Sequence, residues 1–377
     1  MYLNHIELKN FRNYRHLSLD LSRGTTVITG DNGQGKTNFL ESIYYLSSGK
    51  SHRTASQKEI ITDGQDYGLI RASVANGPKS RLIEIELRRD NSYRLRIDKV
   101  YSRKKSEFTS IVSAVIFSPD DLNLVKGSPI FRRNYLDNML DITQKGFSRL
   151  RLQYQKTLNQ RNSLIKSMNF KPGLKPNATV EVWNQNLIGY GLQVMEYRLG
   201  LIAGMEEEFK NLVSYFFPDS NAQISYVPSW NRSSGLPLTP GQDISQQYAR
   251  AMGQSWDKDL ALKTTSTGPH RDDLVITLQG SDLRSFGSQG QQRIAAVALR
   301  LCELFYLKKE MGQSPVLLLD DVMSELDVSR KRLLIEKLKD GFQTFITAAH
   351  INYLEELPLN IAAYYQVKDG RIIQQKI

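Results

Sequence analysis

The chain has a single cysteine, Cys302, among its 377 residues. One cysteine excludes an internal disulfide and a cysteine-based zinc site, and it suits a reducing compartment. No apolar run approaches the roughly 18 residues that a membrane-spanning helix needs. The opening sequence, MYLNHIELKNFRNYR, also lacks the apolar stretch of a secretory signal. We therefore expect a soluble cytoplasmic protein with no membrane partner.

Acidic residues are fewer than basic ones. The chain has 39 Asp and Glu against 50 Lys and Arg, a formal net charge of +11. This balance favours a polyanionic partner, most often nucleic acid, although many basic proteins bind none. The apolar fraction of 40% and the charged fraction of 24% exclude wholesale disorder, and the length predicts two or three domains.

Hydrophobic patterning divides the chain into three parts, 1–118, 119–264 and 265–377. The first and last have the short β-branched and apolar runs of strands between helical segments, whereas the middle part is dominated by helical periodicity. Its two longest helices are predicted at 130–168 and 178–217. The breaker sequence NFKPGLKPN separates them, so they should form an antiparallel helical hairpin. The other expected elements are strands at 2–9, 25–29, 68–76, 80–98, 111–117, 274–278, 316–319 and 344–347, helices at 244–261, 289–310 and 328–339, and a hairpin at 364–374.

A glycine-rich segment between the strand at 25–29 and a helix matches the pattern G-x-x-x-x-G-K-[ST]. Glycines allow backbone N–H groups to turn inward around phosphates, and the following helix offers its N-terminus to the anion. In this pattern Lys36 reaches the β- and γ-phosphates of ATP, and the Thr37 hydroxyl ligates Mg²⁺. The alternative is a glycine-rich turn without a ligand. The candidate ATP-binding residues are Gly30, Asp31, Asn32, Gly33, Gln34, Gly35, Lys36 and Thr37.

The apolar strand VLLL at 316–319 ends in two carboxylates, Asp320 and Asp321. In a phosphate-loop protein this is the Walker B pattern. Asp320 would hold Mg²⁺, directly or through water, and Asp321 stands where a general base can polarise the attacking water. The alternative is a strand that ends in an acidic turn.

A third element, SFGSQGQQR at 285–293, precedes a predicted helix. Ser288 and Gly290 open that helix, so a hydroxyl and backbone N–H groups face an approaching anion. The element resembles the signature motif of ATP-binding-cassette ATPases, which contacts the γ-phosphate of ATP held by the opposite subunit. Asp327, in SELD, resembles the D-loop aspartate of these enzymes, and His350 resembles their switch histidine.

Further motifs are spread over the whole chain: NFRNY at 10–14, SHRT at 51–54, FSPDDL at 117–122, GSP-x-x-RR-x-x-LD at 127–137, TGPHRDDL at 267–274, FGSQGQQR at 286–293 and LLLDDVMSELD at 317–327. Together with the phosphate loop they resemble the RecF family of bacterial recombination mediators, relatives of the chromosome-maintenance (SMC) ATPases. The resemblance implies an α/β fold, with a split ATP-binding-cassette or SMC-type head and a compact, mainly helical inserted lobe. It also implies ATP-dependent homodimerisation, binding to duplex and gapped DNA near the nucleoid, and a partnership with RecR and RecO in loading RecA.

The resemblance also assigns residues within the site. Ser288, Gly290 and Gln291 match the signature, and Arg12 stands where SMC-type heads place a basic residue near the nucleotide. His52 and Arg53 lie where such heads carry an arginine loop. Two features depart from the pattern. Asp321 replaces the usual catalytic glutamate, and its shorter side chain implies a weak ATPase. The resemblance also implies that DNA stimulates this activity. No Q-loop glutamine is evident near residues 118–121.

The inserted part is short and basic. Helices of about 40 residues would be about 60 Å long, too short for the arm of a cohesin-like protein. Residues 126–166 contain nine Lys and Arg against two acids, and residues 79–105 contain ten against four. These clusters favour contacts with DNA phosphates, and we single out Arg149, Arg151 and Lys156. The alternative is an ordinary solvated helix face.

Two other functions remain possible from the sequence. A transporter-type cassette subunit is opposed by the split head, the basic insertion and TGPHRDDL. A DNA-binding scaffold with an inactive nucleotide site is opposed by the intact phosphate-contacting positions.

Overall fold

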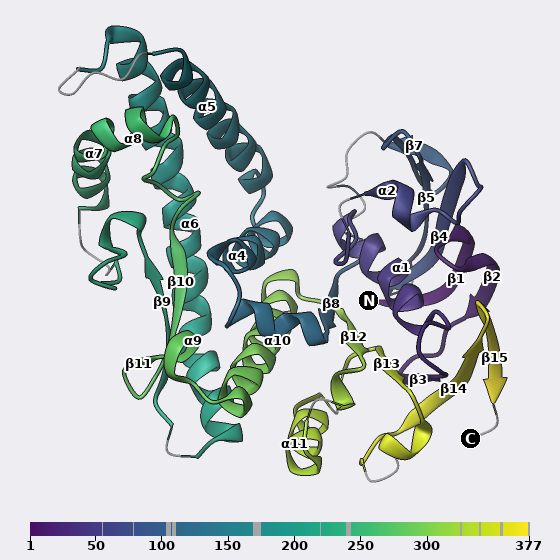
Figure 1. Ribbon diagram of the computed structural model, residues 1–377. Helices are drawn as coiled ribbons and strands as arrows, with labels where there is room; N and C mark the ends of the chain where they lie inside the picture. Colours follow the sequence, from purple (N-terminus) through teal and green to yellow (C-terminus); the bar gives the residue numbers. More distant parts are fainter. Residues whose placement is uncertain are drawn as a thin grey trace. The chain divides into compact units, whose positions relative to one another are not determined.

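The computed structural model describes residues 1–375 except 55, 78, 103–106, 108–110, 169–174, 219, 239–242, 325, 339–340 and 355–356. The chain forms two compact units (Figure 1). Unit 1 comprises Met1–Asp121 and Glu303–Ile377, and unit 2 comprises Leu122–Cys302.

Unit 1 is built on a six-stranded sheet of order β15-β14-β3-β13-β12-β8. All neighbouring pairs are parallel except the β14–β15 hairpin. The strands β3, β13 and β12 and the edge strand β8 are almost completely buried, as expected of a parallel sheet covered on both faces. The strands are β3 Thr25–Thr29, β8 Ala114–Phe117, β12 Val316–Asp320, β13 Thr344–Ala348, β14 Ile361–Lys368 and β15 Arg371–Gln375.

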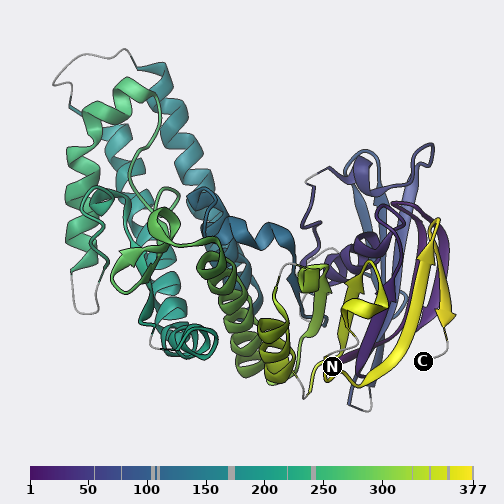
Figure 2. The ribbon, with the colours of Figure 1, turned by 60° about the horizontal axis from the view of Figure 1, so that its bottom comes forward.

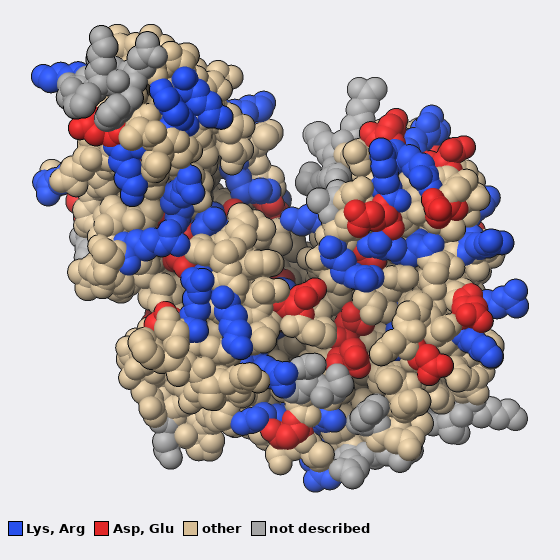
Figure 3. Space-filling model, in the orientation of Figure 1, with Lys and Arg blue, Asp and Glu red and all other residues tan. Residues whose placement is uncertain are grey.

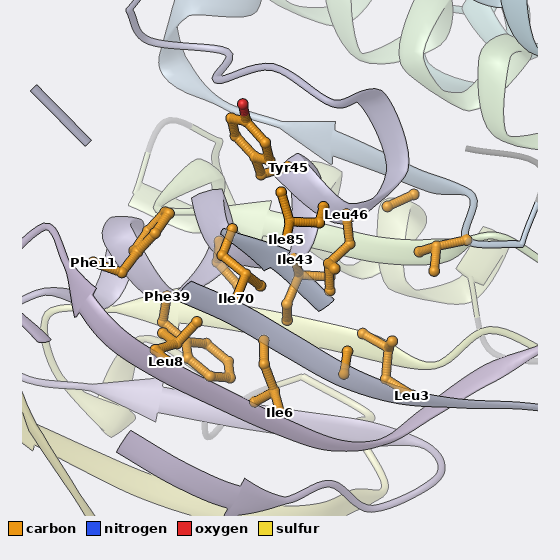
Figure 4. Packing of buried hydrophobic residues seen from close by; sticks show 14 of the residues in the cluster. Leu3, Ile6, Leu8, Phe11, Phe39, Ile43, Tyr45, Leu46, Ile70 and Ile85 are labelled. Carbon is orange, nitrogen blue, oxygen red and sulfur yellow. The ribbon is translucent and has the colours of Figure 1, made fainter. Parts of the chain in front are cut away.

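A second sheet in unit 1 is antiparallel, in the order β2-β1-β4-β5-β6-β7. Helix α1, Lys36–Ser48, forms one core with the inner face of this antiparallel sheet and with the parallel sheet (Figure 4). Phe39 and Ile43 are the contribution of α1 to that core that Figure 4 labels. The side chains of each strand alternate between this core and the outer face. The strands are β1 Tyr2–Phe11, β2 Tyr14–Asp20, β4 Tyr67–Asn76, β5 Lys79–Arg88, β6 Tyr93–Ile97 and β7 Val100–Ser102. Unit 1 also contains α2 Gln57–Ile60, η1 Pro119–Leu124 (which continues into unit 2), η3 Val322–Ser324, α11 Val328–Leu338 and η4 Ile351–Tyr353.

Unit 2 is mainly helical and also contains a small antiparallel sheet, β11-β10-β9 (Figure 2). Its longest helix, α6, spans the 39 residues Ala178–Phe216 and packs against α5 and β9. The other elements are α4 Pro129–Thr143, α5 Phe147–Ser167, β9 Ala222–Val227, η2 Ser229–Asn231, α7 Ile244–Gln254, α8 Trp256–Leu262, β10 Asp273–Leu278, β11 Ser281–Asp282 and α9 Leu283–Phe286. Helix α10, Gln289–Met311, begins in unit 2 and ends in unit 1.

Several predicted elements differ in the structure. The helix expected at 130–168 is two helices, α4 and α5, because the chain turns at Gly146, whose φ is 93°. The helix expected at 244–261 is likewise divided at Ser255 into α7 and α8. The first predicted boundary, after residue 118, lies close to the division at Asp121. The second, after residue 264, falls too early for the compact unit, because β10 pairs with β9 along its full length. The breaker sequence at 169–177 lies partly outside the described residues.

Among the described residues of unit 2, the interior contains three arginine–aspartate pairs. Arg161 and Asp259 are both fully buried, with Nη1 and Oδ2 at 2.8 Å. The other two pairs are Arg132–Asp273 and Arg198–Asp137. Removing one partner of a buried pair strongly destabilises a protein. These pairs therefore hold α4 against β10, α5 against α8, and α6 against α4.

The motif TGPHRDDL is part of this interior. His270 Nδ1 lies 2.6 Å from the Tyr154 hydroxyl, and its Nε2 lies 3.0 Å from the Thr265 carbonyl oxygen. Asp272 accepts hydrogen bonds from the Tyr226 hydroxyl (2.6 Å) and from the backbone of Ser229 (2.7 Å). The motif therefore has a structural role in unit 2: it ties α5 and β9 to β10.

Candidate nucleotide-binding site

Three glycines in the loop between β3 and α1 have positive φ angles, and at two of them neighbouring atoms also leave no room for a Cβ. Gly30 has a φ of 148°, and a Cβ there would overlap the carbonyl oxygen of Val367. Gly35 has a φ of 122°, and a Cβ would come within 2.6 Å of Asn13 Nδ2. The glycines of the sequence pattern are thus required by the close approach of neighbouring backbone and side chains.

Lys36 is folded into this loop, with 8% of its surface exposed. Its Nζ donates hydrogen bonds to the carbonyl oxygens of Gly30 (2.5 Å) and Asp31 (3.0 Å). Burial lowers the pKa of Lys36, and the nearby carboxylates of Asp321 and Asp320 act in the opposite direction. A desolvated ammonium group held at the centre of the loop is placed to bind phosphate oxygens.

Thr37 and Asp320 meet across the loop. Thr37 Oγ1 donates a hydrogen bond to Asp320 Oδ1 at 2.9 Å, and Thr347 Oγ1, on the neighbouring strand β13, donates to the same oxygen at 2.8 Å. Asp320 is 5% exposed, and burial raises its pKa although both hydroxyls oppose the shift. Burial disfavours the charged form of a carboxylate, and a bound cation stabilises that form. Thr37 and Asp320 thus fit Mg²⁺, which is held by one or two protein oxygens together with phosphates and water.

The backbone changes direction at Asp321, immediately after β12 ends. Its φ is 52°, in the left-handed region, and its backbone N–H donates to Thr347 Oγ1 at 2.9 Å. The backbone therefore turns immediately after Asp320, which gives the two adjacent carboxylates different environments: Asp320 is buried and Asp321 is half-buried.

Gln34 joins the phosphate loop to two hairpin turns. Its carbonyl oxygen accepts hydrogen bonds from Asn13 Nδ2 (2.6 Å) and from the backbone of Gly370 (3.2 Å). Its Oε1 accepts one from the backbone of Asp369 (2.6 Å). Sequence reasoning missed Asn13, Asp369 and Gly370 as supports of the loop. The only signals were NFRNY and an Asp-Gly pair inside the predicted terminal hairpin.

Arg12 is bound to a buried carboxylate of α1. Its Nε and Nη2 donate to the two carboxylate oxygens of Glu41 at 2.8 and 2.6 Å, and its Nη1 donates to the carbonyl oxygen of Glu59 at 2.7 Å. Burial alone would raise the pKa of Glu41, but the hydrogen bonds from Arg12 and Ser51 outweigh it and the pKa is lowered. Arg53 Nη1 lies 3.7 Å from the same carboxylate. Glu41, which was not predicted, thus organises the basic residues that the resemblance assigns to this region.

The signature segment begins α10. The Ser288 backbone N–H donates to Gln291 Oε1 at 2.8 Å, and the Gln291 N–H donates to Ser288 Oγ at 3.3 Å. This reciprocal pair is a capping box. Ser288 is exposed and Gly290 is half-exposed. All three residues belong to unit 2, whereas the phosphate loop belongs to unit 1.

Asp327 and His350 are both exposed. Asp327 caps α11, since its Oδ1 accepts from the Arg330 backbone (2.9 Å) and its Oδ2 from the Arg330 guanidinium (2.8 Å). His350 follows β13, the strand that also supplies Thr347. The structure thus brings Thr37, Lys36, Asp320 and Asp321 together, and it leaves the roles of Asp327 and His350 as predictions.

The predicted DNA-contacting residues lie on α5. Arg149, Arg151 and Lys156 are exposed, and Arg151 Nη2 forms an ion pair with Asp141 Oδ2 at 2.7 Å. Figure 3 shows Lys and Arg side chains gathered over this face of unit 2. The charge count for residues 126–166 overestimated the surface charge, because Arg132 and Arg161 are interior residues paired with aspartates.

A phosphate loop between a buried parallel strand and a helix, with Thr37 opposite the carboxylate that ends β12, defines a phosphate-loop ATPase head of the SMC type. A sequence model described as "RecF/RecN/SMC N terminal domain" matches residues 2–372. Curated relatives called "DNA replication and repair protein RecF" include those of Lachnospira eligens, 34% identical over 100% of both chains, and Agathobacter rectalis, 36% identical over 99% of both. The chain therefore belongs to the RecF family.

The solved structures agree with this assignment. A structure of "the recombination mediator protein RecF-ATP in RecFOR pathway" matches with a TM-score of 0.88 and 32% identity, covering 100% of this chain and 98% of that one. An SMC head bound to the winged-helix domain of ScpA matches with a TM-score of 0.57 and 14% identity over 100% and 98% of the two chains, which shows a shared fold. Among the described residues, no helix is both long and apolar enough to cross a membrane.

Proposed function

We propose that the chain is an ATP-switched DNA-binding protein of recombinational repair. It binds ATP and Mg²⁺ at residues 30–37, dimerises in the ATP-bound state and holds duplex or gapped DNA. The observation that carries this proposal is the convergence of Lys36, Thr37 and Asp320 at one end of the parallel sheet, with Thr37 Oγ1 2.9 Å from Asp320 Oδ1. The RecF–ATP relative, at 32% identity over the whole chain, supports ATP as the ligand.

The residues of the loop have distinct roles in this proposal. Lys36 exchanges its two carbonyl acceptors for phosphate oxygens, and backbone N–H groups of the loop bind the remaining charge. Thr37 and Asp320 ligate Mg²⁺, which when bound neutralises charge on the phosphates. Asp321 orients the attacking water and accepts its proton. Aspartate is one methylene shorter than the glutamate usual in such heads, so hydrolysis is slow. In this proposal DNA stimulates hydrolysis, and hydrolysis resets the switch.

The second half of the site comes from another copy of the chain. Ser288, Gly290 and Gln291 stand at the exposed start of α10, and each would contact the γ-phosphate held by the partner subunit's phosphate loop. Arg12, Asp327 and His350 complete the nucleotide environment. Because ATP then lies inside the interface, its binding drives dimerisation by linkage.

DNA is held without sequence preference through phosphate contacts, which include Arg149, Arg151 and Lys156 on α5. The pathway printed for the solved relative supports RecO and RecR as partners, with loading of RecA as the outcome. In this proposal the protein acts at the bacterial nucleoid, where its DNA ligand lies.

The test is the molar mass of the chain by light scattering after size exclusion, with Mg²⁺ and ATP, with Mg²⁺ and ADP, and without nucleotide, each with and without gapped DNA. We expect a dimer only with ATP, and stronger retention of DNA by that dimer. A monomer under all conditions, or a dimer that ignores the nucleotide, would overturn the proposal.

A further inference from the structure

A groove of about 730 Å³ in unit 1 is lined by the ends of two hairpins. β2 contributes Arg15 and His16, β14 contributes Lys368, and β15 contributes Arg371. Three of these four side chains carry a permanent positive charge at neutral pH. Within this lining there is one carboxylate, that of Asp369 in the β14–β15 turn. The groove is therefore net positive.

Two of the cations face one another across the hairpin. Lys368 and Arg371 are directly paired in the β14–β15 register, on either side of a two-residue turn. Side chains of directly paired residues share one face of the hairpin, and like charges in such a pair destabilise it. Within the described part of the chain, neither residue is in an ion pair. An anion bound between them would remove the repulsion.

The same hairpin supports the phosphate loop. Gln34 accepts hydrogen bonds from the backbone of Asp369 at 2.6 Å and of Gly370 at 3.2 Å. Asn13, in the turn before β2, also lines the groove and donates to the same glutamine at 2.6 Å. Both walls of the groove are thus attached to the phosphate loop through one residue, and the groove has a fixed place beside it.

From this geometry we infer that the groove binds the phosphodiester backbone of a nucleic acid. The inference rests on the proposed function, because the ligand is the same polyanion, and it adds a contact surface on unit 1 to that on α5. Arg15, Lys368 and Arg371 are exposed and come from two separate hairpins, which suits successive phosphates along a strand. Charged groups of this kind bind phosphates regardless of base, so the contact carries no sequence preference.

The experiment compares the native chain with K368Q/R371Q and with a matched control, K309Q/R332Q. Lys309 and Arg332 are exposed residues of α10 and α11 in unit 1, outside the groove. The probe is a fluorescein-labelled duplex DNA of random sequence, titrated by anisotropy at several salt concentrations. We expect K368Q/R371Q to weaken binding about tenfold and to make the slope of log K against log salt shallower by up to about 1.8, since each lost phosphate contact removes about 0.9. The control should bind within about twofold of the native chain.

The outcomes separate this inference from the proposed function. If the native chain binds the duplex and K368Q/R371Q binds it equally well, the groove is not a nucleic-acid site, while the proposed function stands. Equal weakening in the control would also overturn the inference, because total charge would then be the cause. If the native chain binds no DNA, the inference and the proposed function both fail. The melting temperature of K368Q/R371Q should equal or slightly exceed that of the native chain, because the repulsion within the hairpin is gone.

Discussion

The phosphate loop and the basic face of α5 differ in how their function is encoded. In the loop, the active groups are adjacent in sequence or lie at the end of one strand, and the backbone itself sets their positions: Gly30 and Gly35 have conformations and neighbours that fix the loop. On α5 and its surroundings, whether a basic side chain is available to a ligand depends on its burial and on its partner elsewhere in the fold. Arg161 and Arg149 lie twelve positions apart, yet one is fully buried and the other is exposed.

A charge count along a segment does not measure the charge on its surface. Arg132 and Arg161 contribute to the excess of positive charge in the sequence, but their aspartate partners lie more than ninety residues away in the chain, at Asp273 and Asp259. A local count of residues 126–166 cannot include them. In a motif such as G-x-x-x-x-G-K-T, in contrast, one short stretch of backbone determines where the functional groups lie.

The first prediction concerns ATP hydrolysis at the phosphate loop and has the largest expected effect. Asp321→Asn should lower the rate of ATP hydrolysis by roughly 100- to 10,000-fold, as expected for loss of a general base. Mg²⁺ and ATP binding should persist, because Asp320 keeps its bonds to Thr37 and Thr347, so ATP-bound dimer should accumulate. Single-turnover hydrolysis and light scattering measure the two quantities.

Asp320→Asn is the matched control for this prediction. It removes a ligand of Mg²⁺, so ATP binding should become weak at low Mg²⁺ and recover partly as Mg²⁺ is raised. Hydrolysis by Asp321→Asn at the native rate would show that Asp321 is not the base.

The next prediction concerns the buried and exposed arginines of α5 in unit 2. Arg161→Met should cost unit 2 about 3–5 kcal/mol of unfolding free energy, because it leaves Asp259 buried without its cation. Arg149→Met, on the same helix, should change it by less than about 0.5 kcal/mol. All 3 tryptophans, Trp183, Trp230 and Trp256, lie in unit 2, so urea unfolding followed by tryptophan fluorescence reports on this unit. Similar losses in the two variants would abolish the distinction between interior and surface arginines.

Much of the fold followed from local patterns, and the parts that did not depended on distant partners. The buried strands β3, β12 and β13 and the helix α6 were predicted almost to their ends, because apolar periodicity is a local property. β9 was missed, since its pairing partner β10 comes after two further helices. Within the candidate site, the phosphate loop and Walker B residues were predicted from spacing, and the structure brings Thr37 and Asp320 together. Glu41, which holds Arg12, and the turn at Asp369 were not, because neither belongs to a motif.

A smaller effect concerns pH and the motif TGPHRDDL in unit 2. Burial lowers the pKa of His270 from 6.5 to about 4. The unfolded chain therefore binds a proton between these values that the folded chain does not, and stability falls as the pH drops from 6.5 towards 4. The loss from this residue amounts to at most about 3–4 kcal/mol, at about 1.36 kcal/mol per pKa unit. At pH 5.5, His270→Gln should reduce the slope of unfolding free energy against pH by up to about 1.4 kcal/mol per unit. An unchanged slope would show that His270 is protonated within the folded unit.

The smallest expected effect decides whether the exposed residues of α5 contact DNA. Changing Arg149, Arg151 and Lys156 to Ala should flatten the slope of log K against log salt by up to about 2.7, and by nearer 2 because Asp141 already neutralises Arg151. The matched control changes Lys210, Arg250 and Lys258, three exposed cations of α6, α7 and α8, and should leave the slope unchanged. Asp141→Asn should strengthen DNA binding slightly, because it frees the Arg151 guanidinium for a phosphate. ATP binding by the monomer should be native in every variant, since none of these residues belongs to the phosphate loop. If the slope of the α5 variant equals that of the control, this face is a solvated helix surface, and the basic hairpins of unit 1 become the first place to look for the DNA.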